Sequence, residues 1–170
     1  MSEHAAALAD RFRAANEAVI AFVEAAPDGL WRRECPAERC TVAALASHVA
    51  GGHGAILDGI VRPIAEGTPG PRYTMDDLAR MNAERAAADA ARPKAEVLAQ
   101  LRAEGARAEA YLRGLSDERL GRTGVPPWGG DPVPAAAMAE HVLVGHPEEH
   151  LASLRQAAGQ EAGGGPAPSA

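Results

Sequence analysis

The segment GHPEEHLASL, residues 145–154, is the most informative part of this sequence, because it carries His146 and His150 four residues apart. Four residues is about one turn of a helix, so both imidazoles lie on one face, within reach of a single metal ion. Two unpartnered imidazoles are costly to bury. A pair on an apolar face therefore indicates a core-facing helix that binds a metal. The apolar residues of that face are Ala139, Val142, Leu143, Leu154 and Ala157.

His48 is the best candidate for a third ligand. It lies at the margin of the apolar arc of an expected helix over 41–64. A catalytic zinc site usually has three protein ligands and one open position, and imidazole suits zinc and related divalent ions. Glycines inside a helix cost about 1 kcal/mol each relative to alanine, so a group of small residues beside His48 indicates close packing or an occupied cavity. These residues are Ala44, Gly51, Gly52, Ala55 and Gly59.

The other three histidines are expected to lie elsewhere. Five residues separate His53 from His48, so its side chain points in another direction, and the same spacing turns His141 away from His146. His4 lies near the N-terminus, where helices fray. Two alternatives stay open at this point: the closely spaced pair can be half-exposed surface residues, and His48 can be a hydrogen-bonded core histidine.

The segment 146–150 also matches the H-x-x-E-H pattern of inverted zinc proteases, in which the glutamate is the general base. Those proteases need a further carboxylate ligand downstream, and the remaining residues offer no helix to carry one. We therefore expect Glu149 to be a solvated helix residue or a residue that supports a ligand, and not a catalytic base.

The periodicity of apolar residues predicts an all-α protein. An aromatic content of 4% and few runs of β-branched residues argue against strands. Longer connections follow the second and third helical segments, and Pro93 kinks or divides the third. We therefore expect an antiparallel four-helix bundle with a flexible C-terminal tail. The expected helices span about 3–26, 41–64, 74–115 and 134–158, with the domain over 1–158 and the tail over 159–170.

Two threonines predict where helices begin. Thr41 precedes the second expected helix, and its hydroxyl can accept from the free amides of the first turn. Thr74 precedes the third, and the carboxylates of Asp76 and Asp77 suit the positive end of the helix dipole.

The composition fits one domain, because 170 residues with 46% hydrophobic content can bury a sizeable core. The 17 basic and 23 acidic residues give a formal charge of −6, and the arginines are spread along the chain, so no nucleic-acid partner is expected. The N-terminal stretch lacks the features of a secretory signal, and no apolar run reaches membrane-spanning length. We therefore expect a cytoplasmic protein without a membrane partner.

These features resemble the DinB-like superfamily of metal-binding four-helix bundles, which includes mycothiol-dependent maleylpyruvate isomerases and bacillithiol transferases. The segment TVAALASHV, residues 41–49, is similar to the family's first metal-ligand helix, and EHVLVGHPEEHLAS, residues 140–153, is similar to its last. The stretches 81–83 and 112–118 also resemble family sequence. The similarity extends over about residues 8–157, with the histidines as its specific part.

The resemblance implies that His48, His146 and His150 bind one divalent transition metal, the same set that the spacing argument selects. It also implies a low-molecular-weight thiol, such as mycothiol, that is used to isomerise or conjugate a small electrophile. The mycothiol-dependent isomerases carry a further C-terminal domain for which this chain has no room, so maleylpyruvate is not the expected substrate. We expect a thiol-dependent S-transferase or isomerase, with zinc preferred over nickel, iron and manganese.

Two other functions remain open. Three neutral imidazoles leave the charge of the ion undiminished, so a coordinated water loses a proton as readily as a coordinated thiol does. A metal-dependent hydrolase would therefore use the same site and act without any thiol. A non-catalytic bundle that binds or sequesters a metal or small molecule would bind its ligand without turnover.

Several residues have no assigned role. Cys35 and Cys40 are expected to be buried or incidental thiols, because they lack a second Cys or His pair at zinc-site spacing. Asn82 can reach the pocket from the third helical region. The alanine-rich stretch 86–91 supports either a homodimer or close packing within one chain.

Overall fold

The computed structural model describes the backbone of residues 2–162 and the side chains of residues 2–159. It is almost entirely helical, as expected, and two short hairpins complete it. The elements are α1 (Glu3–Ala25), α2 (Asp28–Trp31), β1 (Glu34–Cys35), β2 (Cys40–Thr41), α3 (Val42–Ile56), the π-helical turn η1 (Leu57–Val61), α4 (Arg62–Glu66), α5 (Met75–Ala88), α6 (Lys94–Arg113), α7 (Asp117–Gly121), β3 (Thr123–Gly124), β4 (Val133–Pro134), α8 (Ala135–Met138), the π-helical turn η2 (Ala139–Val144) and α9 (Gly145–Ala162).

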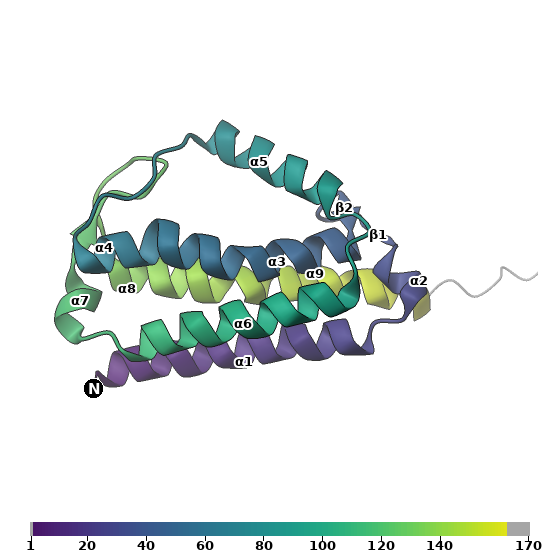
Figure 1. Ribbon diagram of the computed structural model, residues 1–170, viewed down its shortest axis with the longest axis horizontal. Coiled ribbons are helices and arrows are strands. Elements are labelled where there is room, and N and C mark those ends of the chain that lie inside the picture. The colour runs from purple at the N-terminus through teal and green to yellow at the C-terminus, as the bar shows by residue number, and fades with distance from the viewer. Residues whose placement is uncertain (1, 163–170) are drawn as a thin grey trace, which may run out of the picture.

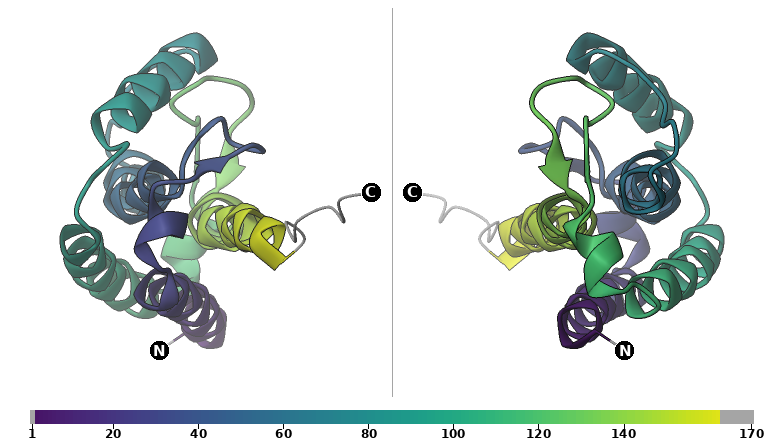
Figure 2. Two further views of the ribbon diagram at one scale, coloured as in Figure 1. Left: turned by 90° about the vertical axis from the view of Figure 1, so that its right-hand side faces the viewer. Right: turned by 90° about the vertical axis from the view of Figure 1, so that its left-hand side faces the viewer.

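Four long helical rods form a four-helix bundle, which confirms the expected fold class (Figure 1). The first rod is α1, the second is α3 with η1 and α4, the third is α6, and the fourth is α8 with η2 and α9. Around the bundle, α1 packs against α6, α6 against α3, α3 against α9, and α9 against α1. The two end-on views show this four-cornered arrangement (Figure 2).

The directions of neighbouring rods differ from the uniformly antiparallel arrangement that we expected. α1 and α6 are antiparallel, because Asp10 pairs with Arg113 and Asn16 with the carbonyl of Leu101. α3 and α6 run in the same direction, since Arg92, just before α6, binds Ser47 near the start of α3, while Gly54 lies against Glu104 further along both helices. This parallel pair requires the chain to return between the second and third rods.

The returning segment is α5, so the third expected helix is two helices. Pro93 is the N-cap residue of α6, where its fixed φ suits a helix start and its missing N–H costs no hydrogen bond. α5 lies outside the bundle and contacts chiefly α3 and β2 (Figure 1). None of its residues is buried. α5 therefore adds little to the core and forms a separate wall above α3.

Two apolar clusters form the core of the bundle. One, at the end of the molecule with α7 and α8, includes Phe12, Leu57 and Leu143, and the other, toward α2, includes Val19 and Leu101. All five side chains are almost fully buried. Burial of this kind stabilises a fold by about 1.5–3 kcal/mol for each large side chain, so the bundle does not depend on a bound ion for its core.

The threonine caps are present where the sequence predicts them. The Thr41 hydroxyl accepts from the amide of Ala44, and Thr74 and Asp77 form a reciprocal capping box at the start of α5. The end of the fourth rod differs from the expected boundary at 158, because α9 continues to Ala162. The remainder of the predicted flexible tail, 163–170, lies outside the described residues. Between residues 2 and 162, no helix combines the length and apolarity needed to cross a membrane.

Candidate metal centre

The three predicted ligands come together between the second and fourth rods. His48 lies on α3, and His146 and His150 lie one turn apart on α9. The Nε2 atoms of His48 and His146 are 2.9 Å apart, and one nitrogen from each of the three rings lies within 4.8 Å of the others. The ring centroids are separated by 4.6 to 5.0 Å. Side chains that are 98 residues apart in sequence thus converge on one point.

Gly52 allows the two helices to approach closely enough for this contact. A Cβ atom built at Gly52 would lie 2.4 Å from Cε1 of His146, a distance that real side chains do not adopt. At Gly51 the nearest atom would be Nε2 of Gln100 at 3.9 Å, so that position has room for a methyl group. The expected role of small residues beside His48 is therefore correct for Gly52, which accommodates the ring of a proposed ligand.

The structure adds Glu38, which the sequence gave no reason to select. Its carboxylate accepts a hydrogen bond from Nδ1 of His150 at 3.1 Å and another from the Ser153 hydroxyl at 2.8 Å. A carboxylate on Nδ1 fixes the tautomer and leaves Nε2 with a lone pair for a metal. Glu38 is 112 residues from His150 in the chain, and only the fold brings them together.

The β1–β2 hairpin places Glu38 at this point. Cys35 is buried and its thiol contacts the carbonyl of Ser153 on α9 at 3.5 Å, so it anchors the hairpin to that helix. Its own carbonyl accepts from the amides of Glu38 and Arg39, and Arg39 adopts the left-handed conformation that closes the turn. This tight turn directs Glu38 toward the histidines.

Burial keeps His48 and His146 neutral. It lowers the pKa of His146 to about 2, with the neighbouring imidazoles His150 and His48 adding to the effect. Burial also lowers the pKa of His48 to about 4; electrostatic interactions with His150 and Arg85 add to the effect, and Glu38 opposes it. Neutral imidazoles have free lone pairs at neutral pH, which is the state a metal requires.

The donor set fits a divalent transition metal. Zinc–nitrogen bonds of about 2.0–2.1 Å in tetrahedral geometry place ligand nitrogens about 3.3 Å apart, and one nitrogen from each of the three rings already lies within 4.8 Å of the others. His146 also has a buried Nδ1 without a hydrogen-bond partner. These residues can therefore hold an ion, with Glu38 orienting one ligand.

A large cavity opens directly onto the three histidines. Its volume is about 1570 Å³, and α3, α5, α9 and the β1–β2 hairpin form its walls. Asn82 on α5 borders it, as the sequence allowed, and so does Trp128 from the loop after β3. Ala86, Ala87 and Ala90 also line this cavity. These three alanines of the stretch 86–91 therefore have a structural role within a single chain. Most of the remaining lining is apolar, and its charged members are Arg32, Glu34, Glu38, Arg39 and Arg85.

The remaining histidines do not join the cluster, as predicted. His53 is fully buried on another side of α3, where its Nε2 lies 2.9 Å from Oδ1 of Asn16 and its ring packs edge-on against Phe12. Burial lowers its pKa to about 4. His4 and His141 are exposed. His53 is therefore a structural core residue.

Other candidate chemistry is not supported by the geometry. Burial raises the pKa of Cys35, and it raises that of Cys40 to about 11, so neither thiol is an effective nucleophile at neutral pH. Within the H-x-x-E-H segment, Glu149 is exposed and Glu148 pairs with Arg11 at 2.7 Å on the outer face of α9. Neither glutamate borders the cavity.

The bundle and its convergent histidines define a class of helical proteins with a candidate three-histidine metal site between two rods. A family model described as the DinB superfamily matches residues 11–154. The chain therefore belongs to the DinB superfamily. No curated protein matches this chain in sequence.

Two solved structures share this fold. YfiT from Bacillus subtilis is described as a probable metal-dependent hydrolase with an unusual four-helix bundle topology. It is 16% identical, with a TM-score of 0.72, and the match covers 95% of this chain and 90% of that one. An uncharacterized protein from Clostridium difficile 630 is also 16% identical, with a TM-score of 0.71 over 92% of this chain and 96% of that one. At this identity the similarity concerns the fold.

Proposed function

We propose that this protein is a metal-dependent enzyme in which His48, His146 and His150 hold one divalent transition ion, with zinc preferred. Its proposed reaction is the transfer of a low-molecular-weight thiol to a small electrophile, or an isomerisation that uses such a thiol. The observation that carries this proposal is the convergence of three imidazoles at the wall of a large cavity. When bound, the ion supplies the charge that lowers the pKa of a coordinated thiol or water.

The residues of the chain have separate parts in this function. The three imidazoles donate neutral nitrogen ligands, and Glu38 orients His150 through its Nδ1. The apolar part of the lining, which includes Leu45, Ile56 and Ile60, provides a surface for the body of the electrophile. A cavity of about 1570 Å³ exceeds the roughly 300–1,000 Å³ that is usual for one small ligand. It therefore has room for a thiol and an electrophile side by side.

A metal-dependent hydrolase is the second candidate, and the similarity to the Bacillus subtilis protein favours it. The same histidines would serve, with water as the nucleophile in place of a thiol. Turnover of an ester or amide without any added thiol would distinguish this function from thiol transfer.

Elemental analysis of tag-free protein tests the metal site. We expect about one equivalent of a transition metal in the wild type and none in the His48→Ala/His146→Ala/His150→Ala variant. The matched control, His4→Ala/His141→Ala, removes two exposed imidazoles and should retain the metal. A wild type that takes up no zinc, nickel, iron or manganese, or a triple variant that keeps its metal, would refute the site.

The thiol is tested on cobalt-substituted protein. Addition of mycothiol or bacillithiol should change the visible spectrum through sulfur coordination. An unchanged spectrum with both thiols, together with hydrolytic turnover in their absence, would replace thiol transfer with the hydrolase function.

A further inference from the structure

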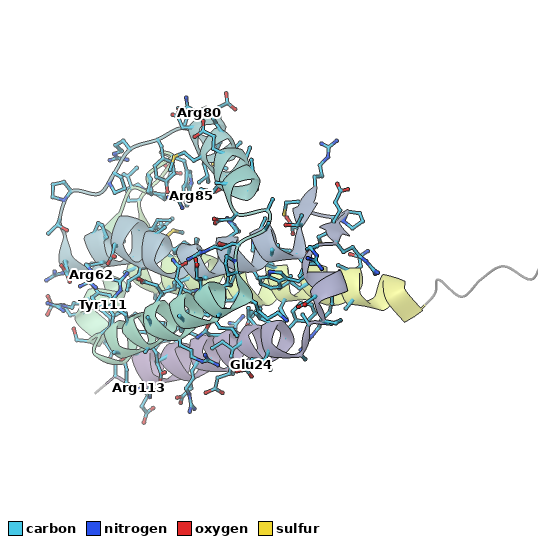
Figure 3. The ribbon with its side chains drawn as sticks, turned by 45° about the vertical axis from the view of Figure 1, so that its right-hand side comes forward. Glu24, Arg62, Arg80, Arg85, Tyr111 and Arg113 are labelled. Atoms are coloured by element: carbon cyan, nitrogen blue, oxygen red, sulfur yellow. The ribbon has the colours of Figure 1, made fainter. Side chains whose placement is uncertain are left out.

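The wall of the cavity that α5 provides carries a cation directed inward. Arg85 borders the cavity that contains the three histidines and also borders a smaller adjoining hollow beside α6. It lies on the side of α5 that faces α3, whereas Arg80, five residues earlier, lies on the outer side, away from the bundle (Figure 3). His48 borders the same two hollows, so Arg85 and a proposed metal ligand face a shared space.

Arg85 has no ion pair among the side chains that the structure describes, although carboxylates lie around it. Asp89 accepts a hydrogen bond from the Ser47 hydroxyl at 2.6 Å. Asp58 and Glu104, which border the smaller hollow with Arg85, both bind Arg107 at 2.6–2.9 Å. The nearby carboxylates are thus engaged with other partners. The guanidinium of Arg85 is left with its donors available to the cavity.

This arrangement contrasts with the rest of α5. Arg80, one turn closer to the start of the helix, pairs with Asp77 at 2.8 Å and does not border either hollow. The side chains that accompany Arg85 on the cavity wall are small or aliphatic, including Leu78, Ala79 and Ala86. Arg85 is therefore the one charged side chain that α5 contributes to this cavity, which Arg32 and Arg39 border from the region of the β1–β2 hairpin.

We propose that Arg85 recognises a carboxylate on the substrate, and that the substrate is a small, largely apolar carboxylic acid whose reactive group reaches the three histidines. A guanidinium binds a carboxylate through two parallel hydrogen bonds, which fixes orientation as well as affinity. The apolar walls then hold the body of the molecule between Arg85 and the histidines. This inference rests on the proposed function, because it takes the cavity to be the substrate site.

The test compares two probes that differ only in charge, 2-naphthoate and 2-naphthamide, by fluorescence titration near pH 7.5. Chelator-treated protein is used, because a bound cation attracts carboxylates by itself. We expect the wild type to bind naphthoate about 10-fold more tightly than naphthamide, as one charge-assisted contact contributes. Arg85→Gln should reduce this preference to less than about twofold, while Arg85→Lys should keep most of it. Arg80→Gln, on the same helix, should leave it unchanged.

A preference that persists in Arg85→Gln, or a wild type without any preference for naphthoate, overturns the proposal. Metal content is measured on separate samples of the same variants, so that the two proposals can fail independently. Arg85-dependent binding in a protein that takes up none of zinc, nickel, iron and manganese supports the carboxylate site and refutes the metal-dependent function. Zinc uptake without an Arg85-dependent preference overturns the carboxylate site alone.

Discussion

Glu38, which lies in the turn of a short hairpin, orients a histidine that lies on a long helix of the bundle. It accepts from both His150 and Ser153, so it is tied to two positions one turn apart on α9. Its hydrogen bond to Nδ1 leaves the other nitrogen of His150 for a metal. The three histidines alone provide the donor atoms, whereas Glu38 selects which atom of one ring is available.

Removal of this carboxylate should weaken metal binding without unfolding the bundle. We expect Glu38→Ala to reduce zinc affinity about 10- to 100-fold, the usual effect of losing a partner of a metal ligand. Glu38→Gln should have a smaller effect, because its amide oxygen can still accept from Nδ1. The measurement is competition with a chromophoric chelator, with helical content followed by circular dichroism. Glu34→Ala is the control, since Glu34 borders the same cavity without contacting a histidine; equal losses in both variants would contradict the assigned role.

At the scale of elements, the bundle and α5 have different parts. α6 packs against both α1 and α3 and buries residues along its length. α5 buries none, yet its inner face closes the side of the cavity opposite the histidines. A helix held by few buried contacts opens locally at a lower free energy than the core of the bundle does. α5 thus lines the cavity and contributes little to the buried core.

The different contributions of α6 and α5 to stability can be measured by replacing one leucine in each helix with alanine. Leu101→Ala in α6 removes a fully buried side chain and should lower the free energy of unfolding by about 2–5 kcal/mol. Leu78→Ala in α5 removes a half-buried one and should cost less than about 1 kcal/mol. Urea denaturation of metal-free protein gives both values. Equal destabilisation by the two substitutions would show that α5 is part of the cooperative core.

At the scale of the whole molecule, buried histidines couple stability to pH. His48, His53 and His146 all have a pKa below the ordinary value of 6.5, with burial as the main cause. In the unfolded chain these imidazoles take up protons below about pH 6.5, while the folded protein resists protonation. Their contribution to stability is therefore complete above pH 6.5 and is lost as the pH falls toward 4.

His53 allows this effect to be isolated, because it lies away from the proposed ligands. A shift from 6.5 to about 4 corresponds to about 3 kcal/mol of stability lost between those two pH values. We expect metal-free His53→Gln, whose amide can still bind Asn16, to show a correspondingly smaller loss than the wild type over this range. His141→Gln, which changes an exposed histidine, should follow the wild type. Parallel curves for wild type and His53→Gln would contradict the assigned burial effect.

Much of the local structure and the three site histidines could be predicted from the sequence. The i, i+4 spacing of His146 and His150, the apolar periodicity and the capping threonines are all local features. A helix has a fixed rise and rotation per residue, so such patterns determine which residues share a face. The exclusion of His53 and His141 from the cluster followed from the same rule, and the structure agrees.

Only the tertiary structure decided how the rods are directed and what surrounds the histidines. Periodicity carries no information on helix direction, so it could not show that α3 and α6 run parallel or that α5 leaves the bundle to make the return. Nor could it place Glu38 beside His150 or Arg85 on the cavity wall, because those contacts join segments far apart in the chain. The sequence by itself determined most of the helices and the i, i+4 pair of His146 and His150, since both depend on short-range spacing. The fold alone determined the cavity and its charges, since these depend on long-range packing.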